Sequence, residues 1–184
     1  MFEEFAKKYI RDVSSALEKM DMNILEEIKK LVKKAIVNKS TIFLIGNGGS
    51  AATPSHSAGD FSKEIGARTI CLTDNIASLT AWANDTDYSN VFLGPLEIYL
   101  DKNDLILGYS GSGNSKNVIE AMKFGRANGA KTVGITGNYL GKGAGKIKEV
   151  SDVCLVFETE SMEIIEDLEL IVNHIIKESI KSEF

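Results

Sequence analysis

Four side chains with metal-binding or acid–base chemistry occur in two pairs at helical spacing. His56 and Asp60 are four residues apart in a segment with a helical pattern, so their side chains point the same way. Glu166 and His174 are eight residues apart in the last helical segment, again close to one face. A lone histidine is more often structural than functional, but this chain has only two histidines and each is paired with a carboxylate. The four side chains together suit zinc or another divalent ion, and they equally suit an acid–base pair.

A glycine-rich turn precedes the helix that carries His56 and Asp60. The apolar run 41–45 is followed by Gly46-Asn47-Gly48-Gly49-Ser50, which predicts a strand, a tight turn and a helix start. Unpaired backbone N–H groups and the helix dipole favour an anion at such a point, and Ser50 can cap the helix or donate to a phosphate oxygen. An ordinary strand-to-helix turn is the alternative interpretation, because short glycine motifs are weak signals.

A second turn of similar design strengthens the phosphate interpretation. The apolar run 105–107 leads into Tyr109-Ser110-Gly111-Ser112-Gly113-Asn114-Ser115, after which a helical pattern begins. Ligands of open α/β sheets bind at the carboxyl ends of the strands, so both turns are expected on the same rim. Neither turn matches the dinucleotide or nucleotide-triphosphate glycine motifs, and three hydroxyl groups beside backbone donors suit a phosphate monoester.

The elements that must position these residues follow an alternating pattern. Two amphipathic helices are expected over residues 1–38, joined near 21–23, with Asp21 or Asn23 capping the second. From residue 41 onward, short apolar runs alternate with helical patterns, which indicates an α/β fold of the three-layer, doubly wound kind with a five-stranded parallel sheet. Strands are expected at 41–45, 69–72, 104–109, 131–136 and 152–157, and helices at 51–65, 76–84, 89–100, 115–128 and 161 to about 181. We expect a single domain over 1–184, with the 1–38 extension packing in an oligomer.

The composition narrows the class of protein. A chain of 184 residues with 43% hydrophobic and 26% charged residues is typical of a globular domain. The net charge of −5 argues against nucleic acid as a partner, because phosphate backbones are held by clustered lysine and arginine. Cys71 and Cys154 lie in short apolar runs and are interpreted as buried thiols. With no leader pattern and no long apolar span, the expected location is the cytoplasm, without a membrane partner.

Taken together, these motifs resemble the sugar isomerase (SIS) fold family, most closely its phosphoheptose isomerase branch. The residues that carry the resemblance are Gly46 to Ala52, His56, Asn84-Asp85 and Ser110 to Ser115. The resemblance implies a homotetramer with active sites at subunit interfaces and the conversion of sedoheptulose 7-phosphate into D-glycero-D-manno-heptose 7-phosphate for bacterial surface sugars such as lipopolysaccharide or capsule. An aldose–ketose isomerase moves a proton between adjacent carbons through an enediol, which needs a base at the carbon and a donor or metal at the oxygens.

The resemblance also implies roles for single residues. Asp60 stands where the family has its carboxylate base, His174 where it has a histidine acid–base, and some members carry zinc, here expected on His56, Asp60, Glu166 and His174. By the same resemblance, the phosphate is expected on Ser50, Ser110, Ser112 and Ser115, and the sugar hydroxyls on Asn47 and Asp85. The remaining residues expected to bind substrate are Gly48, Gly49, Gly111 and Glu166.

Two departures from the family pattern affect the expected substrate. The family usually has glutamate where Asp60 stands and glutamine where Glu166 stands, so one carboxylate is shorter and the opposite helix gains a charge. Two alternatives therefore stay open: an isomerase of a five- or six-carbon phosphosugar, and a non-catalytic phosphosugar-binding or interaction module on the same fold. Retention of His56, Asp60 and His174 argues against the second alternative.

Overall fold

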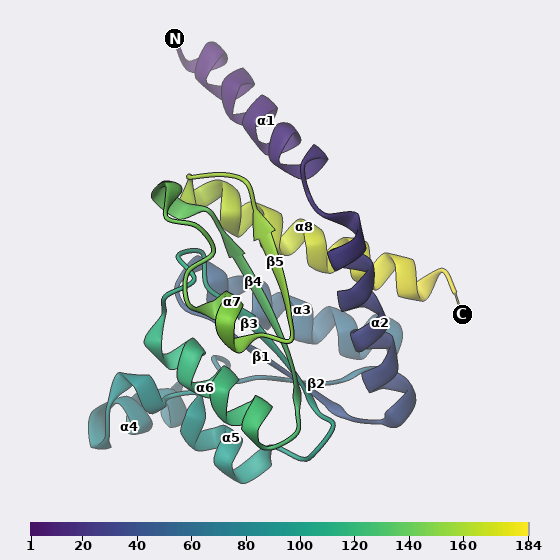
Figure 1. The fold of residues 1–184 in the computed structure, drawn as a ribbon, viewed down its shortest axis with the longest axis vertical. Coiled ribbons are helices and arrows are strands. Elements are labelled where there is room, and N and C mark those ends of the chain that lie inside the picture. The colour runs from purple at the N-terminus through teal and green to yellow at the C-terminus, as the bar shows by residue number, and fades with distance from the viewer. Residues whose placement is uncertain (184) are drawn as a thin grey trace.

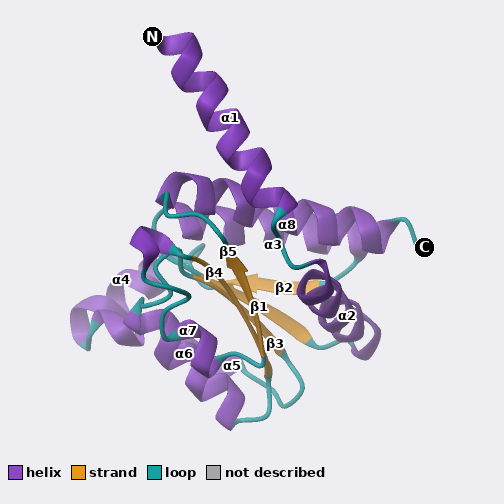
Figure 2. Cartoon of the chain, turned by 45° about the horizontal axis from the view of Figure 1, so that its top comes forward, coloured by secondary structure: helices purple, strands orange, loops and turns teal. Residues whose placement is uncertain are grey.

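The computed structural model describes residues 1–183, which fold around a five-stranded, wholly parallel sheet (Figures 1 and 2). The strands are β1 (Thr41–Ile45), β2 (Arg68–Cys71), β3 (Leu105–Tyr109), β4 (Lys131–Gly137) and β5 (Val153–Phe157). The helices are α1 (Phe2–Glu18), α2 (Met22–Asn38), α3 (Gly49–Ile65), α4 (Ile76–Asp85), α5 (Leu93–Tyr99), α6 (Lys116–Ala127), α7 (Ile147–Val150) and α8 (Met162–Lys181), with the 3-10 turns η1 (Tyr88–Asn90) and η2 (Tyr139–Gly141). The α/β class expected from the sequence is confirmed.

The strand order β2-β1-β3-β4-β5 brings the two motif-bearing turns together. The chain adds β2 on one side of β1 and β3, β4 and β5 on the other, and β1 pairs directly with β3, with Leu44 opposite Leu107. In doubly wound sheets this reversal of direction opens a crevice at the carboxyl ends of the two central strands. The glycine turn after β1 and the serine loop after β3 flank that crevice.

Strand alternation produces two cores, one on each face of the sheet. Ile42 and Leu44 of β1 pack on the side of α2, α3 and α8, whereas Phe43 and Ile45 pack on the side of α5, α6 and α7. All four side chains are fully buried, and burial of each such side chain stabilises the fold by about 1.5–3 kcal/mol. The sheet is therefore a rigid platform between two helical layers.

The leading helices differ in how much they pack. Of the two caps the sequence allowed, Asp21 is the one observed, and it accepts hydrogen bonds from the backbone of Asn23 and Ile24. Helix α2 buries Leu25, Ile28 and Val32, but α1 extends away from the body in Figure 1 and buries only Ala16.

Two expected helices have different boundaries. The helix expected over 89–100 is split into η1 and the shorter α5, with Pro95 in the first turn of α5, where its missing N–H costs no hydrogen bond. Helix α3 begins at Gly49 instead of residue 51, because Gly48 takes up the N-cap position with φ of +58°.

Both cysteines are free; Cys71 is buried and Cys154 half-buried. Within residues 1–183, no helix is long and apolar enough to cross a bilayer.

Candidate functional site

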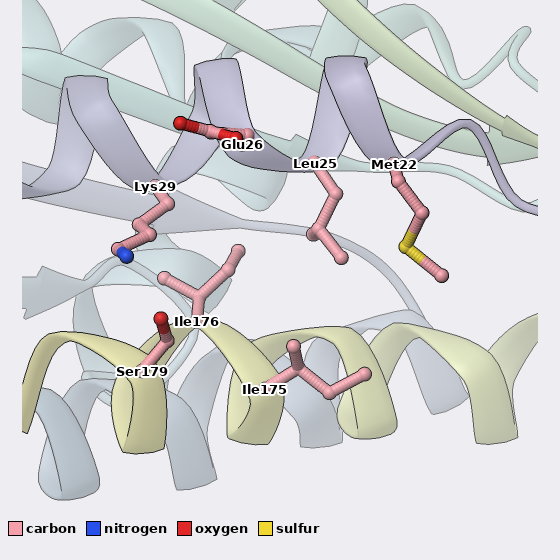
Figure 3. A pocket seen from close by; sticks show the side chains of 7 residues that line it. All are labelled: Met22, Leu25, Glu26, Lys29, Ile175, Ile176 and Ser179. Atoms are coloured by element: carbon pink, nitrogen blue, oxygen red, sulfur yellow. The ribbon is translucent and has the colours of Figure 1, made fainter. Parts of the chain in front are cut away.

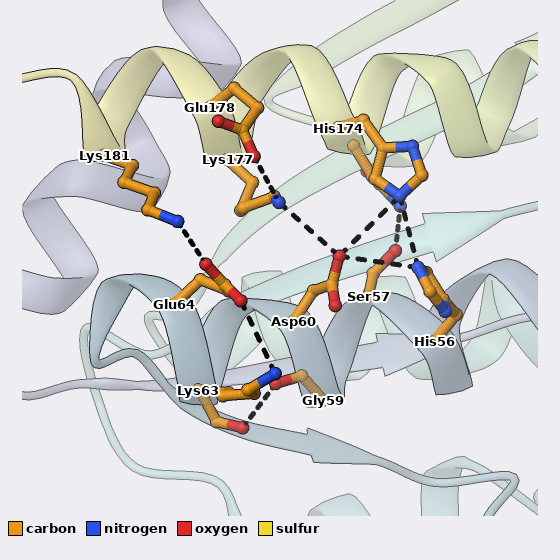
Figure 4. A network of polar contacts seen from close by, with 12 residues as sticks. His56, Ser57, Gly59, Asp60, Lys63, Glu64, His174, Lys177, Glu178 and Lys181 are labelled. Carbon is orange, nitrogen blue, oxygen red and sulfur yellow. Dashed lines mark hydrogen bonds and ion pairs between the residues drawn. The ribbon is translucent and has the colours of Figure 1, made fainter.

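Helices α3 and α8 bring three of the predicted reactive side chains together (Figure 4). The two histidine Nε2 atoms are 3.2 Å apart, and the Asp60 Oδ2 atom lies 3.4 Å from His56 Nε2 and 3.7 Å from His174 Nε2. Both imidazole rings are about half exposed, so a ligand can reach them from solvent. The three side chains form a converging group that we call the His–Asp–His cluster.

The cluster forms because α3 and α8 pack closely over the sheet. Phe61 on α3 and Leu168 and Val172 on α8 are buried in the shared core, which fixes the two helices against each other. Polar contacts add register: Tyr109 of β3 donates to Asn173 at 2.9 Å, and Asn173 donates to Ser57 at 2.7 Å. Ser57 follows His56 and Asn173 precedes His174. These buried hydrogen bonds therefore help to set the distance between the two histidines.

The donor set of the cluster fits a divalent ion. Two histidine nitrogens and one carboxylate are a ligand set found in catalytic zinc sites, which keep a further position open. A tetrahedral ion with bonds of about 2.0–2.1 Å needs neighbouring ligand atoms roughly 3.3 Å apart. The three measured separations, 3.2, 3.4 and 3.7 Å, lie close to that requirement without rearrangement of the helices.

Lys177 is a fourth polar group beside the cluster and was missed in the sequence. Its side chain is only 11% exposed, and its ammonium group lies 3.8 Å from Asp60 Oδ2. The adjacent Glu178 carboxylate raises the pKa of Lys177, so the group carries its positive charge at neutral pH. Lys177 follows His174 by three residues, a spacing that places both side chains on one face of α8 and could have identified it.

The structure does not bring Glu166 into the His–Asp–His cluster. Its carboxyl group lies over Gly49 at the start of α3, so close that a Cβ at residue 49 would be 2.2 Å from it. Burial raises the pKa of Glu166, the neighbouring Glu163 and Asp167 add to the rise, and the backbone N–H of Gly49 opposes it. The anion position at the glycine turn is thus held by a carboxyl group of the chain itself.

Ser50 faces inward from the same turn. Its side chain is buried, and its hydroxyl group lies 2.9 Å from Oε1 of Glu169, which is fully buried. Burial is the main cause that raises the pKa of Glu169 to about 8, so this carboxyl group is neutral at pH 7. Glu169 lies four residues after Ile165 and three before Val172, so the pattern of α8 already places it on the apolar face, and this was the signal that could have identified it.

The serine loop is closed by its own hydrogen bonds at the start of α6. The Ser110 hydroxyl donates to that of Ser115 at 2.9 Å, and the backbone N–H of Gly113 donates to the Ser110 carbonyl at 2.8 Å. Gly111 packs against Met162 and leaves no room for a side chain. Ser110 is buried and Ser112 and Ser115 are half-buried, so the loop presents two hydroxyl groups toward solvent at the N-terminus of α6.

The two residues expected to meet the sugar lie in different surroundings. Asn47 is half-buried and contacts Tyr88 and Asn117, neither of which the sequence analysis identified. Asp85 ends α4, where it is exposed and accepts a hydrogen bond from Asn84. Helix α4 itself buries no side chain within the chain.

A groove between α2 and α8 is a second concave feature (Figure 3). Met22 and Leu25 line it from α2 and Ile175 and Ile176 from α8, with Glu26, Lys29 and Ser179 at its edge. It lacks the histidine and carboxylate groups that converge at the cluster, so it is not the chemical site.

Comparison with known proteins identifies the family. The model of the SIS domain family matches residues 5–137 of this chain. The chain belongs to the SIS domain family.

Individual relatives of this SIS protein agree with one another. A phosphoheptose isomerase of Aliarcobacter butzleri is 37% identical over 164 residues, which cover 86% of this chain and 85% of the relative. A probable phosphoheptose isomerase of Thermoplasma acidophilum is 34% identical over 97% of this chain and 99% of its own length. The structure of the phosphoheptose isomerase of Neisseria gonorrhoeae superposes with a TM-score of 0.90 at 26% identity, covering 99% of this chain and all of that one. These matches confirm the phosphoheptose isomerase branch expected from the motifs.

Proposed function

We propose that this SIS protein is a phosphosugar isomerase that converts sedoheptulose 7-phosphate into D-glycero-D-manno-heptose 7-phosphate through an enediol. The observation that carries the proposal is the meeting of Asp60 and His174 from two different helices, on the rim where the serine loop and the N-terminus of α6 suit a phosphate. Relatives that cover nearly the whole chain and are named phosphoheptose isomerases support the substrate.

The residues divide the work by chemistry. Asp60 removes the proton from the carbon, because a carboxylate within a half-open site can act as a general base. His174 exchanges a proton with the neighbouring oxygen, and the serine loop holds the phosphate through Ser112, Ser115 and the N-terminus of α6. Lys177, 3.8 Å from Asp60, adds positive charge where the enediol develops negative charge.

We infer that His56, Asp60 and His174 hold a divalent ion, with zinc the best match to two imidazoles and one carboxylate. When bound, such an ion acts as a Lewis acid toward the sugar oxygens. Zinc titration followed by elemental analysis is expected to give about one ion per chain, and His56→Ala to lower the zinc content below half of that. Asp12, a partly exposed carboxylate on α1 that pairs with Lys8, provides the control when replaced by alanine. Wild-type protein that retains no zinc after dialysis would contradict the metal assignment.

The length of the sugar is tested with a series of substrates. Ketose phosphates of five, six and seven carbons are compared by kcat/KM with the wild-type protein. We expect the seven-carbon substrate to exceed the others by at least about tenfold, equivalent to roughly 1.4 kcal/mol of transition-state binding. A higher value for a five- or six-carbon substrate would reassign the enzyme within the same chemistry, since Asp60 and Glu166 depart from the family at the sugar end.

We further propose that the protein is a cytoplasmic homotetramer whose sites lie at subunit interfaces. Phe2, Phe5 and Ile10 are exposed on α1, and Ile76 is exposed on α4, which has no fully buried residue, so both helices have faces available to other copies. A phosphorylated substrate and two free thiols are compatible with a reducing compartment. Light scattering that reports a monomer at micromolar concentration would contradict the tetramer.

A further inference from the structure

Three side chains from three separate segments form one hydrogen-bonded group at the crevice between β1 and β3. Asn47 follows β1, Tyr88 begins η1, and Asn117 lies in the first turn of α6. Asn47 Nδ2 is 2.9 Å from Asn117 Oδ1, Asn117 Nδ2 is 2.8 Å from Asn47 Oδ1, and the Tyr88 hydroxyl is 2.9 Å from Asn47 Oδ1. Asn117 is 2% exposed, so its amide group has little access to water.

The backbone fixes which way both amide groups face. The N–H of Val118 can only donate, and the side-chain atom of Asn117 that it meets at 3.0 Å must therefore be the oxygen. The nitrogen of Asn117 then faces Asn47, which must present its own oxygen in return. The orientation of the Asn47 amide is therefore set, through Asn117, by the backbone N–H of Val118 on α6.

The number of hydrogen bonds decides what Asn47 has left for a ligand. Its oxygen accepts from both Tyr88 and Asn117, which uses its two lone pairs. Its nitrogen donates one N–H to Asn117, and the second N–H is available to a ligand. Asn47 is half-buried at the crevice, so the group it can offer is a single N–H donor.

We propose that Tyr88 and Asn117 are positioning residues that lock the Asn47 amide so that it donates one N–H to a carbonyl or hydroxyl oxygen of the sugar. The inference rests on the proposed function, since it assigns the polarity of one contact in that site. Without Tyr88 and Asn117, the side-chain amide of Asn47 could rotate and turn its oxygen to the ligand. Asn47 would then bind a ligand group that donates a hydrogen bond instead of one that accepts it. The lock thus contributes to recognition of the sugar and leaves the phosphate to the serine loop.

The test is a double-mutant cycle with two ligands. Tyr88→Phe and Asn117→Ala are each expected to raise the KM for sedoheptulose 7-phosphate about tenfold, the value of one hydrogen bond, with kcat changed less than about threefold. The inhibition constant for inorganic phosphate is expected to stay within about twofold, because the serine loop is untouched. In an Asn47→Ala background, Tyr88→Phe is expected to have no further effect. Tyr99→Phe and Asn128→Ala, both exposed and remote from the crevice, are the matched controls.

Several results would overturn the lock. If Tyr88→Phe raised the KM by the same factor with asparagine or alanine at position 47, Tyr88 would act independently of Asn47. If the inhibition constant for phosphate rose in parallel with the KM, the substitution would have distorted the crevice as a whole. A measurement without substrate separates this positioning role from the proposed function. In the nuclear magnetic resonance spectrum, one side-chain N–H of Asn47 should exchange slowly with solvent and the other quickly. Asn117→Ala should abolish this difference in exchange rate. Two equally fast protons in wild type would contradict the lock, whereas a clear difference with no turnover of any phosphosugar would contradict only the proposed function.

Discussion

Replacing Asp60 with asparagine is expected to lower kcat for the isomerisation by about 100- to 10,000-fold, the range associated with loss of a general base. Asparagine keeps the size of the side chain and its place beside His56 and His174, but it cannot take the proton from carbon. Because the side chain is about a quarter exposed, the fold is expected to tolerate the change. The measurement is steady-state kinetics with sedoheptulose 7-phosphate, with thermal unfolding as a check on folding.

Glu64 provides the matched control for this variant. It lies one helical turn beyond Asp60 on α3 and pairs with Lys181, away from the histidines (Figure 4). Glu64→Gln makes the same chemical change on the same helix and is expected to leave kcat within about threefold. If Asp60→Asn retained more than about a tenth of wild-type kcat, the base would have to be another group.

Replacing Glu169 with glutamine is expected to stabilise the protein at alkaline pH and to flatten its stability profile. Burial raises the pKa of this carboxyl group from an ordinary value of 4.5 to about 8 in the folded protein. Between these two values the folded state holds a proton that the unfolded state has released, so stability falls as the pH rises, by up to about 1.4 kcal/mol per pH unit. Below the lower value both states are protonated, and above the higher value both are ionised, so the slope vanishes at each end.

The glutamine variant removes this titrating proton and keeps a side-chain oxygen that accepts the hydrogen bond from Ser50. Chemical denaturation between pH 5 and 8.5 is expected to show a free energy of unfolding that falls with pH in wild type and falls markedly less in Glu169→Gln, with the variant more stable at pH 8 by at least about 1 kcal/mol. Glu97→Gln, an exposed glutamate on α5, should follow the wild-type profile. Parallel profiles for wild type and Glu169→Gln would mean that the buried carboxyl group does not titrate in this window.

The sequence predicted the elements well because each carries a local pattern. The five apolar runs coincide with the strands to within one residue, and Asp21 caps α2 as expected. Strand order has no such local signal, because nothing within the run 105–109 says that it pairs with 41–45. The adjacency of the glycine turn and the serine loop therefore becomes definite only when β1 and β3 are seen side by side.

Within the site, spacing along one helix was informative and contacts between helices were less so. The four-residue spacing of His56 and Asp60 predicted a shared face, and their distance of 3.4 Å agrees with it. The spacing between Glu166 and His174 predicted that Glu166 belongs to the same group, yet its carboxyl group lies at Gly49. The reason is that the offset between α3 and α8 along their axes decides which side chain of α8 faces which turn of α3. The same offset sets Ser50 against Glu169 and Asp60 beside Lys177, and these partners on α3 are not specified by any pattern within α8 alone.

Proton transfer through an enediol can be observed directly in a single sample. Wild-type protein is incubated with sedoheptulose 7-phosphate in deuterium oxide, and the aldose product is examined by nuclear magnetic resonance at carbon 2. Because Asp60 and both histidines are partly exposed, the proton they carry exchanges with solvent. We therefore expect an aldose heptose 7-phosphate with deuterium at carbon 2. Absence of any aldose, or an aldose whose carbon 2 carries only protium transferred from carbon 1, would contradict this mechanism.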